Sequence, residues 1–278
     1  MRLARYTVQG QEHWGLIIEN QAHALDAVWP SMTQGIAAGW AAMAEAAREV
    51  APVSTEALTW LPPVQPQSKI LCVGLNYGKH VKETGRDQAA HPSLFLRHID
   101  SFVGHQDAIV KPACSEQFDF EGELCVVIGR EGRHIAAADA MSHVAGYTCM
   151  AENSVRDFQK HTAQVTAGKN FDRSGALGPW ITAAGAIAEV SALRLTTRLN
   201  GNVVQDASLS ELIFPIPELI AYISTFCVLR PGDIIATGTP EGIGSRRTPP
   251  LFMKAGDRLE VEVSDVATLS TRVIDETV

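Results

Sequence analysis

Two glutamates lie two residues apart within residues 118–129, at the start of an apolar run. Successive side chains of a β-strand point to opposite faces, so Glu121 and Glu123 are expected to project from the same side of a strand. Two carboxylates held that close repel each other unless one is protonated or a cation lies between them. Ligands that are all oxygen suit Mg²⁺, Mn²⁺ or Ca²⁺ better than Zn²⁺. The pair therefore indicates a metal site, although two solvated glutamates at a strand edge would show the same spacing.

A histidine and a glutamate that stand three residues apart form a second candidate group. On one turn of a helix, the side chains of His80 and Glu83 would face the same way. A carboxylate bonded to one imidazole nitrogen fixes the tautomer and raises the basicity of the other nitrogen. This is the arrangement of a general base that activates water, and an ordinary surface pair is the alternative. Asn76 and the glycines around it suit a mobile segment that closes over a site.

A third carboxylate follows the apolar residues 147–151. At the end of a strand, Glu152 could complete a three-carboxylate metal site, with Asn153 or Ser154 as the cap of the next helix. The alternative is that Glu152 and Asp157 only favour the N-terminus of that helix electrostatically.

Two further segments suit the binding of an anion. Beside a carboxylate site, Lys169 could hold the negative charge of a substrate oxygen, and a loop lysine in water is the alternative. Residues 236–242 form a glycine-rich turn after a strand, where backbone amides can approach a carboxylate. This turn is not a P-loop, because the Gly-Lys-Ser/Thr end is missing.

The composition is that of a soluble globular protein. The 278 residues are 46% hydrophobic and 19% charged, and the net charge of −8 argues against a nucleic-acid surface. No apolar stretch is long enough to span a bilayer, and the N-terminus lacks the apolar core of a signal peptide. The five cysteines include no C-x-x-C pair. We therefore expect a reduced, cytoplasmic protein that binds neither membranes nor nucleic acid.

The elements that must position these residues fall into two predicted domains. Residues 1–65 are expected to form a small α+β domain, with a hairpin at Gln9-Gly10 and a helix over residues 36–50. Closely spaced prolines at its end predict a linker. Residues 66–278 are expected to form the larger domain, which carries the candidate site.

Short β-branched runs separated by glycines dominate the larger domain. Asn200-Gly201 is a strong hairpin signal, and the Pro-Gly-Asp turn at 231–233 introduces another strand. Helices are expected at 136–141, from near Ser154 onward and at 216–226. These patterns predict a β-rich α+β fold, whose strand order the sequence does not give.

In this order, the motifs resemble the fumarylacetoacetate hydrolase superfamily. The resemblance runs from about residue 69 to residue 273 and rests on Asn76-Tyr77 with His80 and Glu83, Glu121-x-Glu123, Arg156-Asp157-x-Gln159, Gly168-Lys169, and Thr237-Gly238-Thr239-Pro240-x-Gly242. It implies a mixed β-roll, preceded here by the small N-terminal domain of longer bacterial members, and a homodimer. It also implies a bound Mg²⁺ or Mn²⁺ and a small-molecule substrate with a β-diketo or 2-oxo acid unit, such as an acylpyruvate.

The resemblance also assigns roles to residues of this chain. The metal would be held by Glu121, Glu123 and Glu152. His80 would activate water, Glu83 would orient the imidazole, and Lys169 would stabilise the developing enolate. The carboxylate or oxo group of the substrate would be bound by Arg156, Gln159, Gly238 and Thr239.

One position departs from the family pattern. The third metal ligand is usually an aspartate, and the longer Glu152 moves the carboxylate by roughly one bond length. Because Mg²⁺ demands near-octahedral geometry at about 2.1 Å, the ion is expected to be held differently or more weakly, or to be Mn²⁺ or Ca²⁺. The non-enzyme alternative is a ligand-binding protein with a degenerate metal site.

The expected activity is hydrolysis of a carbon–carbon bond in a 2,4-dioxo acid, which gives pyruvate or a related 2-oxo acid and a carboxylic acid. Chelation of a metal by the 2-oxo acid unit favours an enolate, and the His80–Glu83 pair supplies a base that activates water. Without a positioned water, the same enolate chemistry leads to the alternatives. These are decarboxylation of an oxaloacetate-like acid and isomerisation or tautomerisation of an unsaturated 2-oxo diacid.

Overall fold

The strand that follows the glutamate pair forms the centre of the structure. The computed structural model describes residues 1–277, and in it β11 (Gly122–Ile128) is buried along its whole length. It pairs antiparallel with β12 (Val144–Ala151) on one side and with β17 (Ile234–Ala236) on the other. Because strand side chains alternate, the even-numbered apolar residues of β11 enter one hydrophobic core and the odd-numbered ones enter another.

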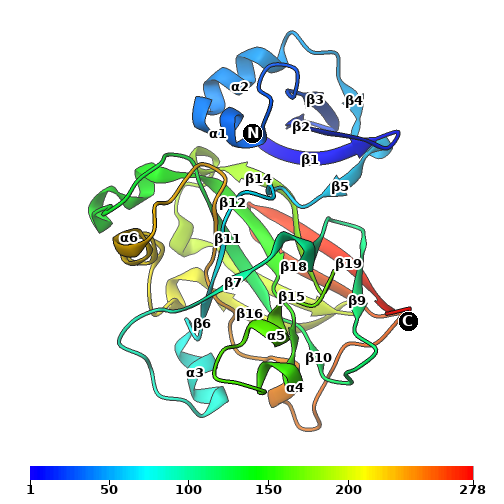
Figure 1. Cartoon of the computed structure of the whole chain (residues 1–278), viewed down its shortest axis with the longest axis vertical. Coiled ribbons are helices and arrows are strands. Elements are labelled where there is room, and N and C mark those ends of the chain that lie inside the picture. The colour runs from blue at the N-terminus through cyan, green and yellow to red at the C-terminus, as the bar shows by residue number, and fades with distance from the viewer. Residues whose placement is uncertain (278) are drawn as a thin grey trace.

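β11 belongs to a large sheet that extends through both parts of the chain (Figure 1). Its further strands are β1 (Arg2–Val8), β2 (Gln11–Ile18), β3 (Gln21–Ala24), β4 (Val53–Ser54), β5 (Thr59–Leu61), β6 (Ile70–Gly74), β7 (Ser93–Arg97), β8 (Phe102–Val103) and β14 (Gly175–Ala183). The strand order is β4-β3-β2-β1-β14-β12-β11-β17-β6-β7, with β5 beside β1 and β8 beside β14. The pairs β17–β6 and β14–β8 are parallel, which makes the sheet mixed.

A second sheet packs against the middle of the first. Its strands are β9 (Ala108–Lys111), β15 (Arg194–Leu199), β16 (Asn202–Ser208), β18 (Arg258–Val263) and β19 (Ala267–Asp275), in the order β16-β15-β18-β19-β9. The pair β19–β9 is parallel. At Gly122 the sheets approach so closely that a Cβ would lie 2.1 Å from Thr197 Oγ1. The predicted β-rich fold with mixed strand directions is confirmed.

The N-terminal residues add β1 to β5 and two short helices to the large sheet. The hairpin at Gln9-Gly10 is confirmed, since β2 follows β1 directly and both turn residues have positive φ. The single helix predicted over residues 36–50 is wrong. Two helices, α1 (Met32–Ala38) and α2 (Trp40–Ala47), meet at Gly39, whose φ of 90° interrupts the helical backbone.

The large sheet is continuous across the predicted domain boundary, because β1 pairs with β14. Apolar side chains of α1 and α2 share a hydrophobic core with residues of β11, β14 and β17. Residues before and after position 65 therefore contribute strands to one sheet. The division into two domains at this position stays a prediction.

Among the described residues of the larger part there are four α-helices, and the longest of them, α6, has 11 residues. They are α3 (Gly78–Thr84), α4 (Arg156–Gln159), α5 (Thr166–Lys169) and α6 (Ile216–Phe226). The helix predicted at 216–226 is confirmed, whereas the one predicted at 136–141 is a 3-10 helix over Ala137–His143. Ser154 does not cap a helix, because it lies in β13 (Ser154–Val155), which pairs with β10 (Phe118–Asp119).

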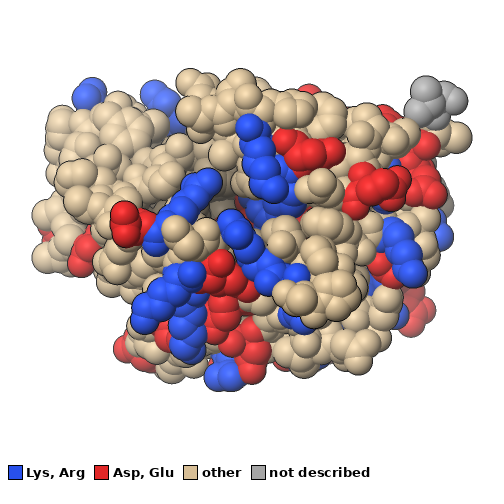
Figure 2. All heavy atoms as spheres, turned by 90° about the horizontal axis from the view of Figure 1, so that it is seen from below, with Lys and Arg blue, Asp and Glu red and all other residues tan. Residues whose placement is uncertain are grey.

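Other expectations concern turns, cysteines and membranes. The hairpin at Asn200-Gly201 is confirmed between β15 and β16. All five cysteines are free thiols in the structure, and three of them are buried. No helix among residues 1–277 is both long enough and apolar enough to cross a bilayer. On the end of the molecule that carries α3 and α4, lysine and arginine side chains lie interspersed with aspartate and glutamate (Figures 1 and 2).

Candidate active site

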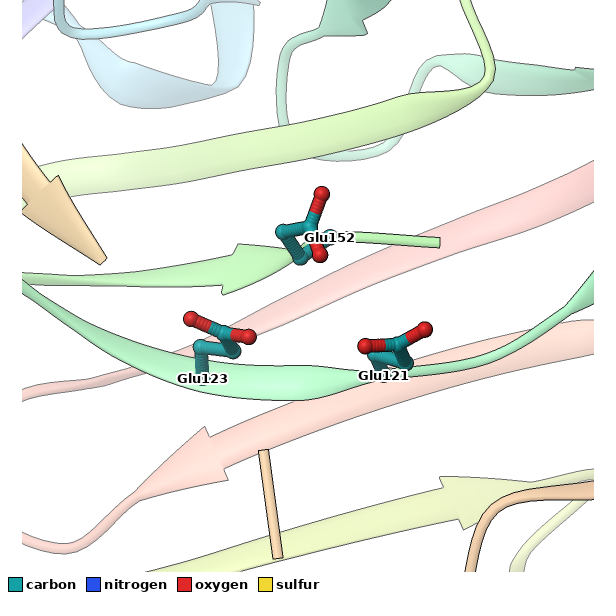
Figure 3. A group of neighbouring side chains, drawn as sticks. All are labelled: Glu121, Glu123 and Glu152. Carbon is teal, nitrogen blue, oxygen red and sulfur yellow. The ribbon is translucent and has the colours of Figure 1, made fainter. Parts of the chain in front are cut away.

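Three glutamate side chains meet at the ends of two neighbouring strands (Figure 3). Gly122 of β11 pairs with Ala151 of β12, and just beyond this pair the amide of Glu152 donates to the carbonyl of Glu121 at 2.8 Å. Glu123 lies on the same face as Glu121. Each glutamate is at most 6% exposed, and one carboxylate oxygen of each lies within 4.8 Å of the others. The strand pairing therefore brings together the three carboxylates that the sequence suggests as metal ligands.

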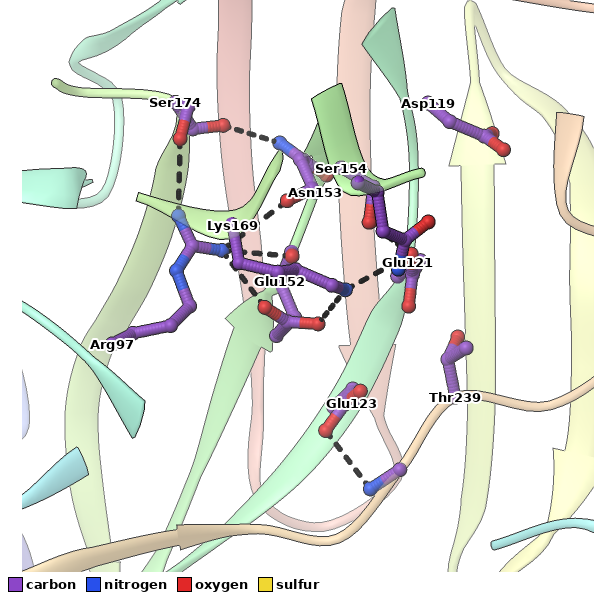
Figure 4. Close-up of polar contacts among 12 residues, drawn as sticks. Arg97, Asp119, Glu121, Glu123, Glu152, Asn153, Ser154, Lys169, Ser174 and Thr239 are labelled. Carbon is purple, nitrogen blue, oxygen red and sulfur yellow. Dashed lines mark hydrogen bonds and ion pairs between the residues drawn. The ribbon is translucent and has the colours of Figure 1, made fainter. Parts of the chain in front are cut away.

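Three buried cations surround these carboxylates, and Figure 4 shows two of them, Arg97 and Lys169. Lys169 Nζ, at the end of α5, lies 3.1 Å from Glu121 Oε1 and also contacts Glu152 Oε2. Arg156 Nη1, at the start of α4, lies 2.8 Å from Glu121 Oε1. Arg97 Nη1, at the end of β7, lies 3.0 Å from Glu152 Oε1. Two of the three glutamates thus have direct counter-charges.

The carboxyl groups differ in their electrostatic surroundings. Burial acts to raise the pKa of Glu121, but the cations of Arg156 and Lys169 outweigh it and lower that pKa to about 2. Burial raises the pKa of Glu123 well above its ordinary value, and the carboxylates of Glu152 and Glu121 raise it further. Glu123 makes no ion pair within the part of the chain that the structure describes. A divalent cation beside Glu123 would oppose both effects.

The donor set fits a hard divalent cation. All three donors are carboxylate oxygens, as Mg²⁺ and Mn²⁺ prefer, and the group includes no histidine or cysteine that would favour Zn²⁺. The glutamate that lacks a protein counter-charge lies beside the other two. Glu121, Glu123 and Glu152 could therefore hold a metal ion, and the identity of that ion stays a prediction.

His80 and Glu83 form the predicted pair on α3. Nδ1 of His80 lies 3.1 Å from one carboxylate oxygen of Glu83, and the other oxygen accepts the amide of Gly242 at 3.0 Å. His80 is buried and lines the same cavity as the three glutamates. Because Nδ1 faces Glu83, Nε2 is the ring nitrogen left for a ligand. The pair thus has the geometry of a base that is held in one orientation.

The residues predicted to bind the substrate occupy different positions. Arg156, Gln159 and Thr239 line the cavity. Nη2 of Arg156 is buried without a hydrogen-bond partner within the described chain, so it is a donor suited to a substrate oxygen. Gly238 has a φ of 104°, and its amide donates to Glu123 at 2.9 Å. Gly238 therefore supports a carboxylate of the triad, and its contact with the substrate stays a prediction.

Asn76 connects two distant segments of the site through its side chain, and the mobility of the segment around it stays a prediction. It is fully buried, and its Nδ2 donates to the carbonyls of Thr237 at 2.8 Å and Phe214 at 3.1 Å. Its Oδ1 accepts the amide of Phe214 at 2.8 Å. One side chain therefore joins the chain between β6 and α3 to the loop that contains Gly238.

Replacement of Asn76 by alanine is expected to lower the free energy of unfolding by about 1–3 kcal/mol, because it leaves buried backbone groups without partners. Urea unfolding of the metal-free protein measures this change. Asn202→Ala, at an exposed position, serves as the control and should change stability by less than about 0.5 kcal/mol. Equal stability of the two variants would contradict the anchoring role of Asn76.

The three glutamates and His80 line one cavity of about 970 Å³. Its walls come from the segment between β6 and α3, from β7, from α4 and α5, and from the loop after β17. Three exposed cations, Arg86, Lys160 and Arg246, also line it. A cavity with buried carboxylates inside and exposed cations at its mouth suits a small anionic molecule that also binds a metal ion.

Some residues of the site carry no signal that sequence reasoning found. Arg97 ends an ordinary apolar strand, so its contact with Glu152 depends on the tertiary fold alone. Asp119 accepts the amides of Gly244 and Ser245 and pairs with Arg156 at 2.7 Å. It stands two residues before Glu121, so the same alternation that joins the glutamates could have identified it.

Comparison with known sequences identifies the family. Residues 69–274 match the family described as fumarylacetoacetate (FAA) hydrolase C-terminal. The chain is 39% identical over 259 residues to the human protein named oxaloacetate tautomerase FAHD2A, mitochondrial, which covers 91% of this chain and 82% of that protein. It is 41% identical over 213 residues to oxaloacetate tautomerase YisK of Bacillus subtilis, which covers 75% of this chain and 70% of that protein.

A solved structure extends the likeness to the whole chain. Maleylpyruvate hydrolase from Sphingobium sp. SYK-6, in complex with manganese (II) ion and pyruvate, superposes with a TM-score of 0.82 at 29% identity. The match covers 100% of both chains. On the family match, the sequence relatives and this shared fold, the chain belongs to the fumarylacetoacetate hydrolase superfamily.

Proposed function

We propose that this chain catalyses the keto–enol tautomerisation of an oxaloacetate-like 2-oxo dicarboxylate. The observation that carries the proposal is one cavity that combines a buried three-glutamate site with exposed cations. The 2-oxo acid end of such a substrate chelates a divalent metal, and its second carboxylate needs cations. Relatives at 39% and 41% identity are named oxaloacetate tautomerases, which favours this reaction over others of the superfamily.

Different residues of the site would bind the metal ion and the two carboxylates of the substrate. Bound Mg²⁺ or Mn²⁺, held by the three glutamates, would act as a Lewis acid that polarises the 2-oxo group and favours the enolate. Nη2 of Arg156, the buried donor without a protein partner, would donate to a carboxylate oxygen of the substrate. The exposed cations Arg86, Lys160 and Arg246 would attract the second carboxylate.

Proton transfer would then fall to His80 and Lys169. Nε2 of His80 would accept a proton from the carbon beside the 2-oxo group, and the electron pair of that C–H bond would form the double bond of the enolate. Glu83 at Nδ1 would stabilise the imidazolium. The ammonium of Lys169 would stabilise the negative oxygen and donate a proton to it to complete the enol, after which His80 would release its proton to solvent and Lys169 would regain one. No water and no second reactant are consumed.

The test uses oxaloacetate presented as its enol form. With Mn²⁺ and protein present, the decay of the enol absorbance is expected to accelerate well above the uncatalysed rate, without release of pyruvate. Release of carbon dioxide and pyruvate would instead assign the decarboxylase alternative. Enol decay at the uncatalysed rate, with and without Mn²⁺, would contradict the proposal.

A second candidate function is hydrolysis of a carbon–carbon bond in a 2,4-dioxo acid. The observation that favours it is the buried His80–Glu83 pair, which could activate water as well as remove a carbon-bound proton. The maleylpyruvate hydrolase of similar fold carries manganese and pyruvate. Release of pyruvate from a simple acylpyruvate by this chain would support hydrolysis, and its absence beside rapid enol decay would favour tautomerisation.

Replacement of Arg246 by methionine is expected to raise the KM for oxaloacetate by about 3–10-fold at low salt, because an exposed cation attracts the second carboxylate through screened charge. Inhibition by pyruvate, which has one carboxylate, should change little. Steady-state kinetics at two salt concentrations measures both effects. Arg194→Met, at an exposed site outside the cavity, is the control, and an equal change for both acids would contradict this role.

A homodimer and a cytoplasmic location stay predictions from the sequence. The human relative carries the word mitochondrial in its name, so the compartment of this chain is open to direct test by fractionation.

A further inference from the structure

Glu152 uses its two carboxylate oxygens for different partners. Oε1 lies 3.0 Å from Nη1 of Arg97, and Oε2 contacts Lys169. Glu152 lines the cavity, whereas Arg97 is not part of its wall. In Figure 4, Arg97 approaches Glu152 from the side away from Glu121 and Glu123. Arg97 therefore binds Oε1 on the side away from the other two glutamates, and Oε2 lies on the side that faces them.

Arg97 is itself held in one orientation. Its Nε donates to Ser101 Oγ at 3.2 Å, and its Nη2 donates to Ser174 Oγ at 3.0 Å. Nη1 also donates to the backbone carbonyl of Glu152 at 2.7 Å. The guanidinium carbon lies 4.3 Å from the centre of the Phe102 ring, and the side chain is fully buried. Because the guanidinium cannot turn freely, it fixes the position of the Glu152 oxygen that it binds.

We propose that Arg97 is the positioning residue that allows a glutamate to serve as a metal ligand at position 152. A glutamate has one more rotatable bond than an aspartate, so it loses more conformational freedom when its carboxylate is fixed. Arg97 restricts the Glu152 side chain before a metal ion binds, because its planar guanidinium binds both the carboxylate and the backbone carbonyl of Glu152. Oε2 then points toward Glu121 and Glu123.

This inference rests on the metal site of the proposed function and not on the reaction. A lysine at position 97 would keep the positive charge but lose the planar fork, so it could not fix the carboxylate in the same way. An aspartate at position 152 would draw the carboxylate back from the other two glutamates or from Arg97. Arg97 and Glu152 should therefore behave as a matched pair.

The test is the affinity of the full chain for Mn²⁺ alone, measured by titration calorimetry. Arg97→Lys is expected to weaken binding by about 10-fold or more, as is usual when a residue that orients a metal ligand is changed. Glu152→Asp should also weaken it. The Mn²⁺ affinity of the double variant Arg97→Lys with Glu152→Asp should equal or exceed that of whichever single variant binds Mn²⁺ less tightly. The losses should not add, because the two changes disrupt one arrangement.

The controls separate positioning from folding. Arg194→Lys, in the exposed pair with Asp206, should leave Mn²⁺ affinity unchanged. If Arg97→Lys only lowers the melting temperature and keeps the Mn²⁺ dissociation constant within about twofold, Arg97 is structural and the inference is overturned. If that variant does not fold, Ser174→Ala carries the test, since it removes one contact to Arg97. Ser174→Ala should then weaken Mn²⁺ binding severalfold, and unchanged affinity would overturn the inference.

Measurements of Mn²⁺ binding and of tautomerisation by the unsubstituted parent chain distinguish failure of this inference from failure of the proposed function. A parent chain that binds no Mn²⁺ also overturns the positioning role of Arg97. A parent chain that binds Mn²⁺ tightly and yet does not accelerate tautomerisation overturns the proposed function alone.

Discussion

Exchange of Glu123 for glutamine is expected to lower metal-supported turnover by about 1,000-fold, because a Lewis acid contributes several kcal/mol of transition-state stabilisation. Glu123 is the member of the triad without a protein cation beside it, so a bound metal is its expected counter-charge. The amide has nearly the same shape as the carboxylate, and one oxygen remains to accept the Gly238 amide. Steady-state kinetics with saturating Mn²⁺, together with calorimetry, measures the loss.

The same exchange should not destabilise the metal-free chain. Burial and the neighbouring carboxylates raise the pKa of Glu123, so its ionised form opposes folding at neutral pH. A neutral amide removes that repulsion, and the melting temperature without metal should stay equal or rise. Glu262→Gln, on β18 outside the cavity, is the matched control. A Glu123→Gln variant that keeps full metal-dependent activity would contradict the assignment of this ligand.

Replacement of His80 by glutamine is expected to lower kcat by about 10²–10⁴-fold, which is the usual contribution of a general base. The affinity for Mn²⁺ should change little, because His80 is not one of the three carboxylate donors. Glu83→Gln should have a smaller effect in the same direction, since it keeps a hydrogen-bonding group beside Nδ1 but removes the charge. The rate of turnover above the uncatalysed rate tests the role of His80 as a base. Calorimetry of Mn²⁺ binding tests whether His80 supports the metal site instead.

A control for His80 comes from an exposed histidine elsewhere. His134 lies outside the cavity and has a φ of 54°, which asparagine tolerates, so His134→Asn should keep full activity. If His80→Gln turns over oxaloacetate at the rate of the parent chain, the base must be another group. If it binds Mn²⁺ much more weakly than the parent chain, His80 supports the metal site instead.

The sequence predicted the parts of the site that depend on local geometry. Glu121 and Glu123 project to the same side, as the period of two along an extended chain predicts, with Glu123 in β11 and Glu121 directly before it. His80 and Glu83 meet because three residues make about one turn of a helix, and α3 has that form. The order of the motifs along the chain indicated the family, and the family match over residues 69–274 confirms that assignment.

Contacts between distant segments could not be read from the sequence. Arg97 reaches Glu152 only because β7 lies at one edge of the large sheet, in a strand order that local patterns do not determine. Ser154 has the residue type of a helix cap, yet β13 forms there and its hydroxyl donates to Glu121. The helix predicted over residues 36–50 is interrupted at Gly39, which has a positive φ. Helix propensity is summed over many residues, so it does not register one residue with a non-helical backbone.

The choice between reactions is harder still, because the same residues serve both. A base at His80 could remove a proton from carbon or activate water, and the sequence favoured water because His80 and Glu83 are both present. The names of the relatives move the proposal toward tautomerisation. No single residue of the site distinguishes the two reactions.

The central claim is that metal bound by the three glutamates supports tautomerisation of oxaloacetate. The most direct measurement is the rate of enol decay as Mn²⁺ is added to chelator-treated protein, with bound Mn²⁺ counted in the same samples. The account predicts that the rate rises with occupancy and levels off at one Mn²⁺ per chain, without release of pyruvate. A rate that is independent of bound Mn²⁺, or that stays at the uncatalysed value when the site is full, would contradict it.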